Sequence, residues 1–143
     1  MIKIRKVLLT DSENIYKFGE VEKSFRVSEE IKFYEKEELE EWIRKKKDIL
    51  LIAMEKEEIV GFACCKVMSS HWGVVDNLYV KEEWRKKGVG SLIFNKIIFL
   101  LKKKKIKYVN VLVDVMDSKT RGYLEKRGFK SQKEYVWMDK FIG

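Results

Sequence analysis

The sequence predicts a mixed α/β domain, and three observations lead to that class. Apolar, β-branched runs of strand length occur at Ile49–Met54, Ile59–Val67 and Val74–Val80. The apolar stretch Leu92–Leu101, which only Asn95 and Lys96 interrupt, is too long for a typical strand and indicates a helix. A valine-rich run, Tyr108–Val115, follows this helix directly, as a right-handed crossover to a parallel strand would require. We therefore expect one sheet with both antiparallel and parallel neighbours.

The N-terminal third of the chain adds one strand and two helices. Isoleucines at positions 2 and 4 alternate with basic residues, which indicates a first strand. Thr10-Asp11-Ser12 offers N-cap residues for a helix over about Asp11–Lys23. The segment Glu37–Lys47 has an apolar stripe at helical spacing and a basic end, and predicts a second helix. Between the two helices, Phe25–Tyr34 has no clear period.

The C-terminal third predicts a helix and a closing hairpin. Asp117 can cap a helix over Ser118–Lys126, and Gly128 follows in the C′ position. The last two strands are expected at Phe129–Ser131 and Glu134–Asp139, with their large side chains packing inward, notably Trp137 and Met138. The predicted order is β-α-α-β-β-β-α-β-α-β-β in a single domain over residues 1–143.

Composition narrows the functional classes. A hydrophobic content of 45% excludes a disordered chain, and no apolar run approaches the roughly 20 residues of a membrane span. The N-terminus lacks a secretory apolar core, so we expect a cytoplasmic protein. Cys64 and Cys65 are strand neighbours that point to opposite faces, and with a single histidine they predict no metal site. At least one of them is expected in the core.

The net charge of +8 indicates an anionic partner of some kind, such as nucleic acid, an anionic cofactor or an acidic substrate. Part of the excess lies in Lys102–Lys105, which fits a solvated helix end beside the negative pole of the dipole. A nucleic-acid surface would favour aromatic residues interleaved with the lysines, and this cluster has none. A sequence-specific nucleic-acid site is therefore not expected.

The central stretch of the chain is the basic loop between the strand Val74–Val80 and the following helix. The first N–H groups of a helix have no intrahelical partners, and with the dipole they form an anion site suited to phosphate. Gly88 and Gly90 let a ligand approach the backbone closely. Three cations precede them, at Arg85, Lys86 and Lys87. The loop therefore predicts a phosphate-binding site.

These residues also resemble a known family. Arg85 to Gly90 matches the Arg/Gln-x-x-Gly-x-Gly/Ala pyrophosphate loop of the GNAT superfamily of acyl-CoA-dependent N-acyltransferases. Leu78-Tyr79-Val80 is similar to the family's approach to that loop, and Leu124–Phe129 resembles its Tyr-x-x-x-Gly-Phe segment. The resemblance implies the same element order, with the mixed sheet splayed between strands 4 and 5.

The resemblance implies acetyl-CoA as co-substrate and no metal. The pyrophosphate would lie on the loop and helix start, and the pantetheine would run along the preceding strand. The implied cofactor-binding residues are Leu78, Tyr79, Val80, Arg85, Lys86, Lys87, Gly88, Val89, Gly90, Ser91, Asp117 and Leu124. The helical region before Tyr34 would border the acceptor, which makes Phe25, Phe33 and Tyr34 candidate pocket residues.

The implied chemistry is direct attack of an amine on the thioester. Asp76 is the first candidate for the base, and His71 the second. The backbone N–H of Leu78 is the candidate oxyanion donor. The family's acidic tyrosine is replaced by Leu124, which leaves Tyr123, one residue earlier, as the candidate acid although it is rotated by about 100°.

The leading interpretation is an N-acetyltransferase that acts on a primary amine of a small molecule or a protein. A non-catalytic acyl-CoA-binding module is one alternative, and a basic nucleic-acid-binding domain is another. The expected partners are acetyl-CoA and an amine acceptor, with no membrane and no specific nucleic acid. A second copy of the chain, forming a homodimer, is kept as a further candidate partner.

Overall fold

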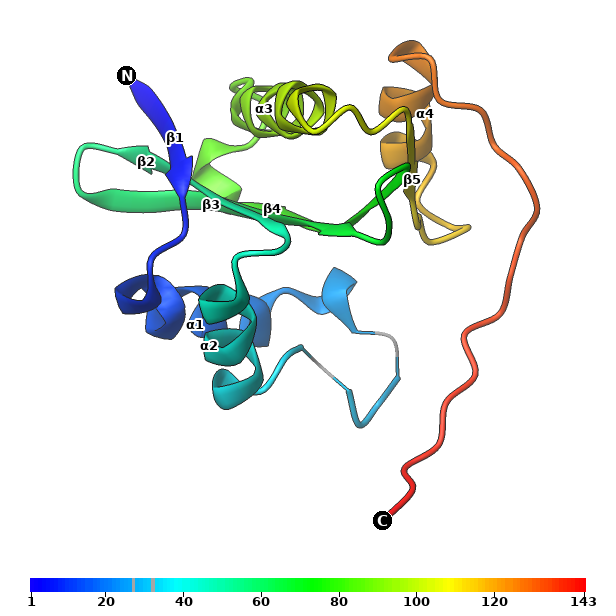
Figure 1. The fold of residues 1–143 in the computed structure, drawn as a ribbon, viewed down its shortest axis with the longest axis horizontal. Coiled ribbons are helices and arrows are strands. Elements are labelled where there is room, and N and C mark those ends of the chain that lie inside the picture. The colour runs from blue at the N-terminus through cyan, green and yellow to red at the C-terminus, as the bar shows by residue number, and fades with distance from the viewer. Residues whose placement is uncertain (27, 32) are drawn as a thin grey trace. The chain divides into compact units, whose positions relative to one another are not determined.

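The computed structural model describes residues 1–26, 28–31 and 33–143 and divides the chain into two compact units. The first unit is Met1–Val111, which holds a sheet with helices on both faces (Figure 1). The second is Leu112–Gly143, which holds one helix and an extended tail. The division leaves the prediction of a single domain over residues 1–143 as a prediction.

The described residues of the first unit form five strands and three α-helices in the predicted order. Single 3₁₀ turns precede α1, follow it, and precede α3, at Leu9–Asp11, Lys23–Phe25 and Glu82–Trp84. The main elements are β1 (Ile2–Lys6), α1 (Ser12–Val21), α2 (Lys36–Lys45), β2 (Ile49–Glu55), β3 (Glu58–Val67), β4 (Trp72–Val80), α3 (Val89–Lys103) and β5 (Tyr108–Val111).

The sheet has the order β1-β2-β3-β4-β5. The first three pairs are antiparallel, whereas β4 and β5 are parallel and α3 forms the crossover between them. The helix α3 covers one face of the sheet, and α1 and α2 cover the other (Figure 1). The predicted mixed α/β class and the predicted parallel crossover are both confirmed.

The predicted fifth strand is shorter than expected. β5 ends at Val111, not at Val115. The chain turns after Asp114, whose carboxylate accepts a hydrogen bond from the backbone N–H of Met116 at 2.8 Å and whose carbonyl accepts one from Asp117 at 2.9 Å. A short polar side chain that accepts a hydrogen bond from the backbone two residues later favours a turn. Here this turn ends the strand although the sequence after it is rich in β-branched residues.

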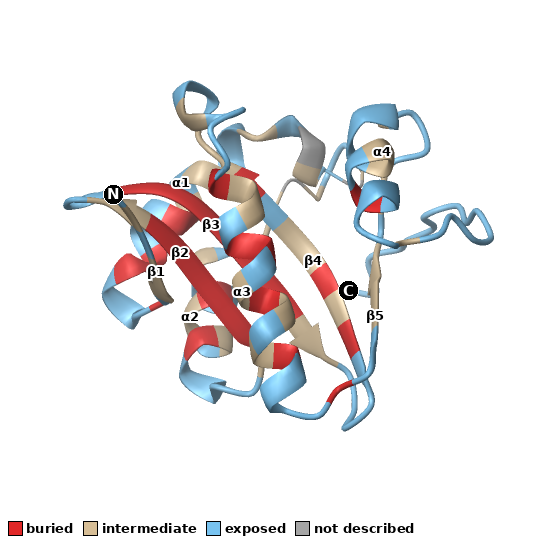
Figure 2. Ribbon diagram, turned by 90° about the horizontal axis from the view of Figure 1, so that it is seen from above, coloured by how far each residue is buried: buried red, intermediate tan, exposed pale blue. Residues whose placement is uncertain are grey.

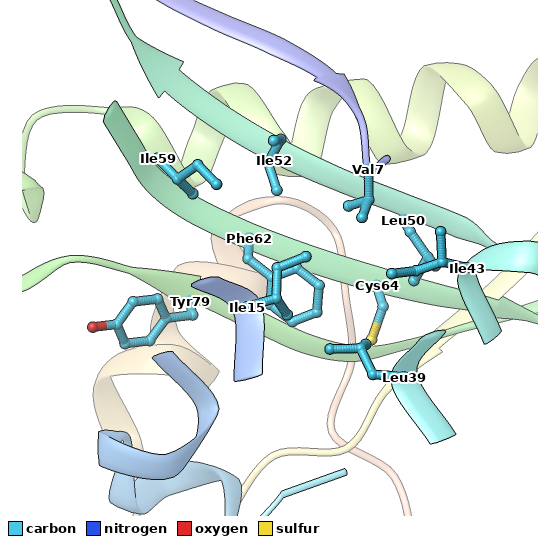
Figure 3. Packing of buried hydrophobic residues seen from close by; sticks show 10 residues of the cluster. All are labelled: Val7, Ile15, Leu39, Ile43, Leu50, Ile52, Ile59, Phe62, Cys64 and Tyr79. Atoms are coloured by element: carbon cyan, nitrogen blue, oxygen red, sulfur yellow. The ribbon is translucent and has the colours of Figure 1, made fainter. Parts of the chain in front are cut away.

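The main core lies between the sheet and the helices α1 and α2. Because β2 and β3 are covered on both faces, their sequences are nearly continuous apolar runs and they are buried along most of their length (Figure 2). Side chains of both helices point at the inner face of these strands (Figure 3). The cluster comprises Val7, Ile15, Leu39, Ile43, Leu50, Ile52, Ile59, Phe62, Cys64 and Tyr79.

Both cysteines are buried, and no disulfide joins them. Cys64 faces α1 and α2, and Cys65 lies on the α3 side, where its sulfur is near the position a Cβ on Gly73 would take. Burial raises the pKa of the Cys65 thiol to about 12 and also raises that of Cys64. Two protonated thiols inside the sheet are structural residues, as the sequence predicted for at least one of them.

The start of α1 differs in detail from its prediction. Asp11 is the N-cap residue, but its side chain makes no capping bond to the helix. Instead the buried carboxylate accepts two bonds from Arg5, at 2.9 and 3.1 Å, and one from the backbone N–H of Leu8 at 2.7 Å. This carboxylate therefore ties the end of β1 to the helix start.

In the second unit, the helix α4 spans Ser118–Lys126, as predicted. Asp117 caps it by accepting a bond from the N–H of Thr120 at 3.0 Å, and Gly128 follows with a φ of +92°.

The predicted closing hairpin is wrong. Residues 127–143 contain no strand or helix, and Trp137 and Met138 are 56% and 89% exposed. This unit contains no sheet against which an alternating segment could pair, and an isolated hairpin is marginal in water.

Candidate active site

The loop between β4 and α3 leaves the start of the helix open. Gly88 is the N-cap of α3, with a φ of +84°, and Lys86 also has a left-handed backbone, with a φ of +61°. The carbonyl of Gly88 accepts a hydrogen bond from the N–H of Leu92 at 3.1 Å. The N–H groups of Val89 and Gly90 lie before this first hydrogen bond of the helix. A Cβ placed on Gly88 would meet no heavy atom within 4 Å. The backbone at Gly88 is therefore open to the approach of a ligand.

Arg85 contacts the protein around the loop. Its Nε donates to the carbonyl of Val80 at 2.8 Å, and its Nη2 donates to the Glu22 carboxylate at 2.9 Å. Its guanidinium also lies 5.9 Å from the centre of the Tyr79 ring. These contacts join the loop to the end of β4 and to Glu22, the C-cap of α1. Of the two lysines that follow, Lys87 places its ammonium 5.2 Å from the Trp84 ring centre.

The end of β4 has an edge that β5 does not cover. The parallel ladder pairs Trp72–Val75 with Tyr108–Val111 and stops there. The last residues of β4, Asp76–Val80, therefore have no β5 residue opposite them on this edge. On the opposite edge, the N–H of Lys81 donates to the carbonyl of Val60 at 2.8 Å. Since hydrogen-bonded pairs alternate along an antiparallel ladder, Leu78 directs its N–H and C=O away from β3. A second extended molecule can bond to this edge.

Asp76 occupies a β-bulge in β4. In the register with β3, Cys64 lies opposite Asn77 and Cys65 lies opposite Val75, so Asp76 is the extra residue. The thiol of Cys64 donates weakly to the side-chain oxygen of Asn77 at 3.7 Å, and Cys64 belongs to the core beneath α1 and α2. The bulge therefore lets Asp76 and Asn77, although consecutive, both face the side of the sheet covered by α1 and α2.

Two side chains contact the carboxylate of Asp76, which is 26% exposed. The hydroxyl of Tyr34 donates to Oδ2, and the ammonium of Lys66 lies 3.6 Å from the same oxygen. Burial is the main reason that the pKa of Tyr34 is raised, with the neighbouring Cys64 and Asp76 adding to it. Tyr34 is thus a permanently protonated donor that holds the Asp76 carboxylate in place.

A pocket of about 280 Å³ opens beside Asp76, on the α2 side of the sheet. The ammonium of Lys66 lies 5.8 Å from the Tyr34 ring centre and 5.4 Å from the Trp42 ring centre, so the two rings and the carboxylate surround it. The pocket is lined by Tyr34, Glu38, Glu41, Trp42, Lys45 and Lys66.

Of the three predicted pocket residues, the structure places one at the pocket and two elsewhere. Tyr34 lines the pocket, whereas Phe25 and Phe33 stack on each other in the core with ring centres 5.4 Å apart. Sequence reasoning missed Lys66 and Trp42. The position of Lys66 near the end of β3, on the same face as Asp76, could have been deduced only from the strand register.

The remaining predicted residues are His71 in the first unit and Asp117, Tyr123 and Leu124 in the second. His71 is exposed in the turn before β4, five positions ahead of Asp76, which is roughly 15 Å along a strand. Tyr123 belongs to the second unit, where the Arg127 guanidinium lies 4.4 Å from its ring centre, and Leu124 in the same unit is buried. The roles of Asp117, Tyr123 and Leu124 toward the cofactor stay predictions.

Among residues 1–26, 28–31 and 33–143, no three histidine, cysteine or acidic side chains gather in a way that could hold a metal ion. No helix in that same part of the chain is long and apolar enough to cross a bilayer.

Comparison with known proteins decides the family. The sequence model of the Acetyltransferase (GNAT) family matches residues 14–129, which include the whole phosphate loop and the Gly128-Phe129 segment. This chain belongs to the GNAT acetyltransferase family. No curated protein sequence matches it.

Solved GNAT structures share the fold across nearly the whole chain. The PaiA N-acetyltransferase of Thermoplasma acidophilum, solved with coenzyme A, is 24% identical, with a TM-score of 0.73 over 94% of this chain and 93% of that one. Ard1 of Thermoplasma volcanium is 18% identical, with a TM-score of 0.78 over 92% and 84%. The aminoglycoside acetyltransferase meta-AAC0020, from an uncultured soil metagenomic sample and solved with sisomicin, is 15% identical, with a TM-score of 0.77 over 99% and 97%. At these identities the likeness concerns the fold.

Proposed function

We propose that this GNAT acetyltransferase transfers an acetyl group from acetyl-CoA to a primary amine of a small molecule or a protein. The observation that carries the proposal is the open, glycine-capped start of α3 directly after an uncovered strand edge. A coenzyme with a pyrophosphate followed by an amide-containing arm needs those two features in that order. We propose a cytoplasmic location, as expected from the sequence.

The loop supplies the anion site in this proposal. The N–H groups from Gly88 to Ser91 face the pyrophosphate, and Lys86 and Lys87 add positive charge at the mouth. Arg85 acts mainly by fixing the loop, since its bonds to Val80 and Glu22 hold the chain in the conformation that exposes those donors. The edge of β4 at Leu78, Tyr79 and Val80 bonds the pantetheine arm. Asp117 and Leu124 complete the proposed cofactor set.

Asp76 is the proposed base. A lysine-like amine has an ordinary pKa of about 10.4, so only about one molecule in a thousand is neutral near pH 7.4 and able to attack. Asp76 contacts two residues that line the pocket, Tyr34 and Lys66, and in this proposal it accepts the amine's proton directly or through a water. The hydroxyl of Tyr34 keeps the carboxylate aimed at the acceptor side.

The N–H of Leu78 is the proposed oxyanion donor. Leu78 lies two residues after Asp76 and directs its N–H toward the uncovered edge, where an acyl group carried by the pantetheine would lie. When bound, acetyl-CoA supplies an acyl carbon with a thiolate leaving group.

The departure at Leu124 favours one alternative. A leucine cannot protonate a leaving thiolate, and Tyr123, the candidate acid from the sequence, is one residue earlier and rotated by about 100° around the helix. A chain that binds acyl-CoA without transferring the acyl group is therefore the second candidate function. It differs from the first in a single observable, the release of free thiol.

An amine panel tests the proposal. The purified chain is incubated with acetyl-CoA and with small primary amines, peptides with free N-termini, and lysine peptides, and free thiol is followed over time. We expect thiol release that depends on at least one amine, and we expect desulfo-CoA to inhibit it. Tight CoA binding with no amine-dependent thiol release would support the binding module, and a chain that binds no CoA would overturn both functions.

A further inference from the structure

The ammonium of Lys66 occupies the pocket in which an acceptor amine would react. It lies 3.6 Å from Oδ2 of Asp76 and within 6 Å of the ring centres of Tyr34 and Trp42. A carboxylate and two aromatic faces attract an alkylammonium, and here a primary amine already lies among them. Here the chain provides the amine itself, from the neighbouring strand β3.

The distances allow Lys66 to reach the acyl group. Leu78, whose N–H is the proposed oxyanion donor, follows Asp76 by two residues, which is about 7 Å along a strand. The Lys66 side chain is 42% exposed and has four rotatable bonds, so its end can move by several ångströms without disturbing β3. Its only ion pair among the described residues is the one with Asp76, and at 3.6 Å that pair is loose.

We propose that Lys66 is acetylated by the chain's own active site, within one molecule. The inference rests on the proposed function, because the donor is acetyl-CoA bound at the loop. Asp76, directly or through water, takes a proton from the ammonium, and the Nζ lone pair attacks the thioester carbonyl carbon. A C–N bond forms, the C–S bond breaks, and the thiolate leaves with the sulfur electron pair. The nitrogen loses its second proton, which protonates the thiolate through solvent, and Asp76 passes the first proton to solvent. No oxidant or reductant is needed.

Acetylation at this place changes the pocket. The amide of acetyl-lysine carries no charge, so the ion pair with Asp76 and the attraction to the two rings are both lost. Asp76, Tyr34 and Trp42 then face the pocket without an internal cation. The modified chain is expected to admit an external amine more readily than the unmodified chain.

Lys81 is a matched control within the same chain. Its ammonium lies 3.0 Å from the Glu58 carboxylate and 5.4 Å from the centre of the Phe18 ring, so it has the same kinds of contact as Lys66. It differs from Lys66 in its tighter ion pair and in its lower exposure, 25% against 42%. Chemical acetylation by free acetyl-CoA depends neither on Asp76 nor on the CoA site, whereas the proposed reaction depends on both.

The experiment uses the full chain with acetyl-CoA and measures acetylation of each lysine by peptide mass spectrometry over time. We expect Lys66 to react at least tenfold faster than Lys81, with a rate constant that does not depend on protein concentration. Desulfo-CoA should suppress the reaction, and Lys66→Arg should remove the added acetyl mass.

Three results would overturn the inference. They are equal rates at Lys66 and Lys81, no suppression by desulfo-CoA, and a rate constant that increases with protein concentration. The Asp76→Asn variant, checked for folding by circular dichroism, should slow the acetylation of Lys66 and leave the acetylation of Lys81 unchanged. Amine-dependent thiol release, measured in parallel, separates a failure of this inference from a failure of the proposed function. Activity on external amines with an unmodified Lys66 refutes only this inference, whereas absence of CoA binding refutes the proposed function as well.

Discussion

Gly90 offers a test of the phosphate site in which binding can be separated from stability. A Cβ on Gly90 would meet Cδ2 of Leu78 at 3.7 Å and Cγ2 of Val80 at 3.8 Å, which are ordinary contacts. The position does not have a positive φ, unlike Gly88. The Gly90→Val protein should therefore fold with little loss, of the order of the helix-propensity difference of less than about 1 kcal/mol.

The expected effect on CoA is much larger. A side chain at Gly90 keeps a phosphate away from the first N–H groups of α3, and a hydrogen bond to a charged group contributes about 1.5–3 kcal/mol. Loss of one such bond raises the Kd of CoA by roughly 10- to 150-fold. Gly88→Ala should behave differently, because its left-handed backbone makes a Cβ cost about 1–2 kcal/mol of stability even where it touches nothing.

Calorimetric titration with CoA and denaturant unfolding measure the two effects on the same samples. Gly90→Ala is the matched control, because the family pattern accepts alanine at that place and CoA affinity should be nearly unchanged. A Gly90→Val protein that folds normally and binds CoA as tightly as the parent would refute the assignment of this loop.

Three further outcomes are expected. Asp76→Asn should lower kcat/KM by about ten- to a thousandfold near neutral pH with little change in CoA affinity, and an unchanged pH–rate profile would exclude Asp76 as the base. Leu124→Tyr should be faster than the parent while Tyr123→Phe changes little; loss of turnover in folded Tyr123→Phe would identify Tyr123 as the acid instead. Asp117→Ala should destabilise α4 by about 1 kcal/mol in denaturant unfolding, whereas Asp117→Asn should keep most of the cap. The bonds from Thr120 lower the pKa of Asp117, so its contribution is complete above about pH 4 and is lost as the pH falls through the lowered folded-state pKa; equal acid sensitivity of the parent and the asparagine variant would contradict this.

Local chemistry explains why the phosphate loop could be predicted from the sequence. Gly88 takes a left-handed backbone that other residues avoid, and a long apolar run follows it at once, so a turn and a helix start are specified within a few residues. The same holds for α4, where Asp117 and Gly128 mark the two ends of the helix. The paired strands β2 and β3 were likewise evident, since burial on both faces requires continuous apolar sequence.

The acceptor side of the site had no such local signal. Tyr34 and Asp76 are 42 positions apart, and they meet only because the bulge at Asp76 turns its carboxylate toward the segment before α2. A bulge depends on the register between two strands, which no short window of sequence contains. The same limit explains the failed hairpin over residues 129–139, where an alternating pattern has no partner strand within its own unit.

Sequence alone thus determined the parts whose physics is local: the helix ends, the buried strands and the anion-binding loop. Tertiary structure decided the parts that depend on strand register and packing. These include the pairing of Lys66 with Asp76, the aromatic faces of Tyr34 and Trp42 around it, and the use of Arg85 to fix the loop. Most of these contacts join different elements of the fold, so their energy is realised only after those elements have packed together.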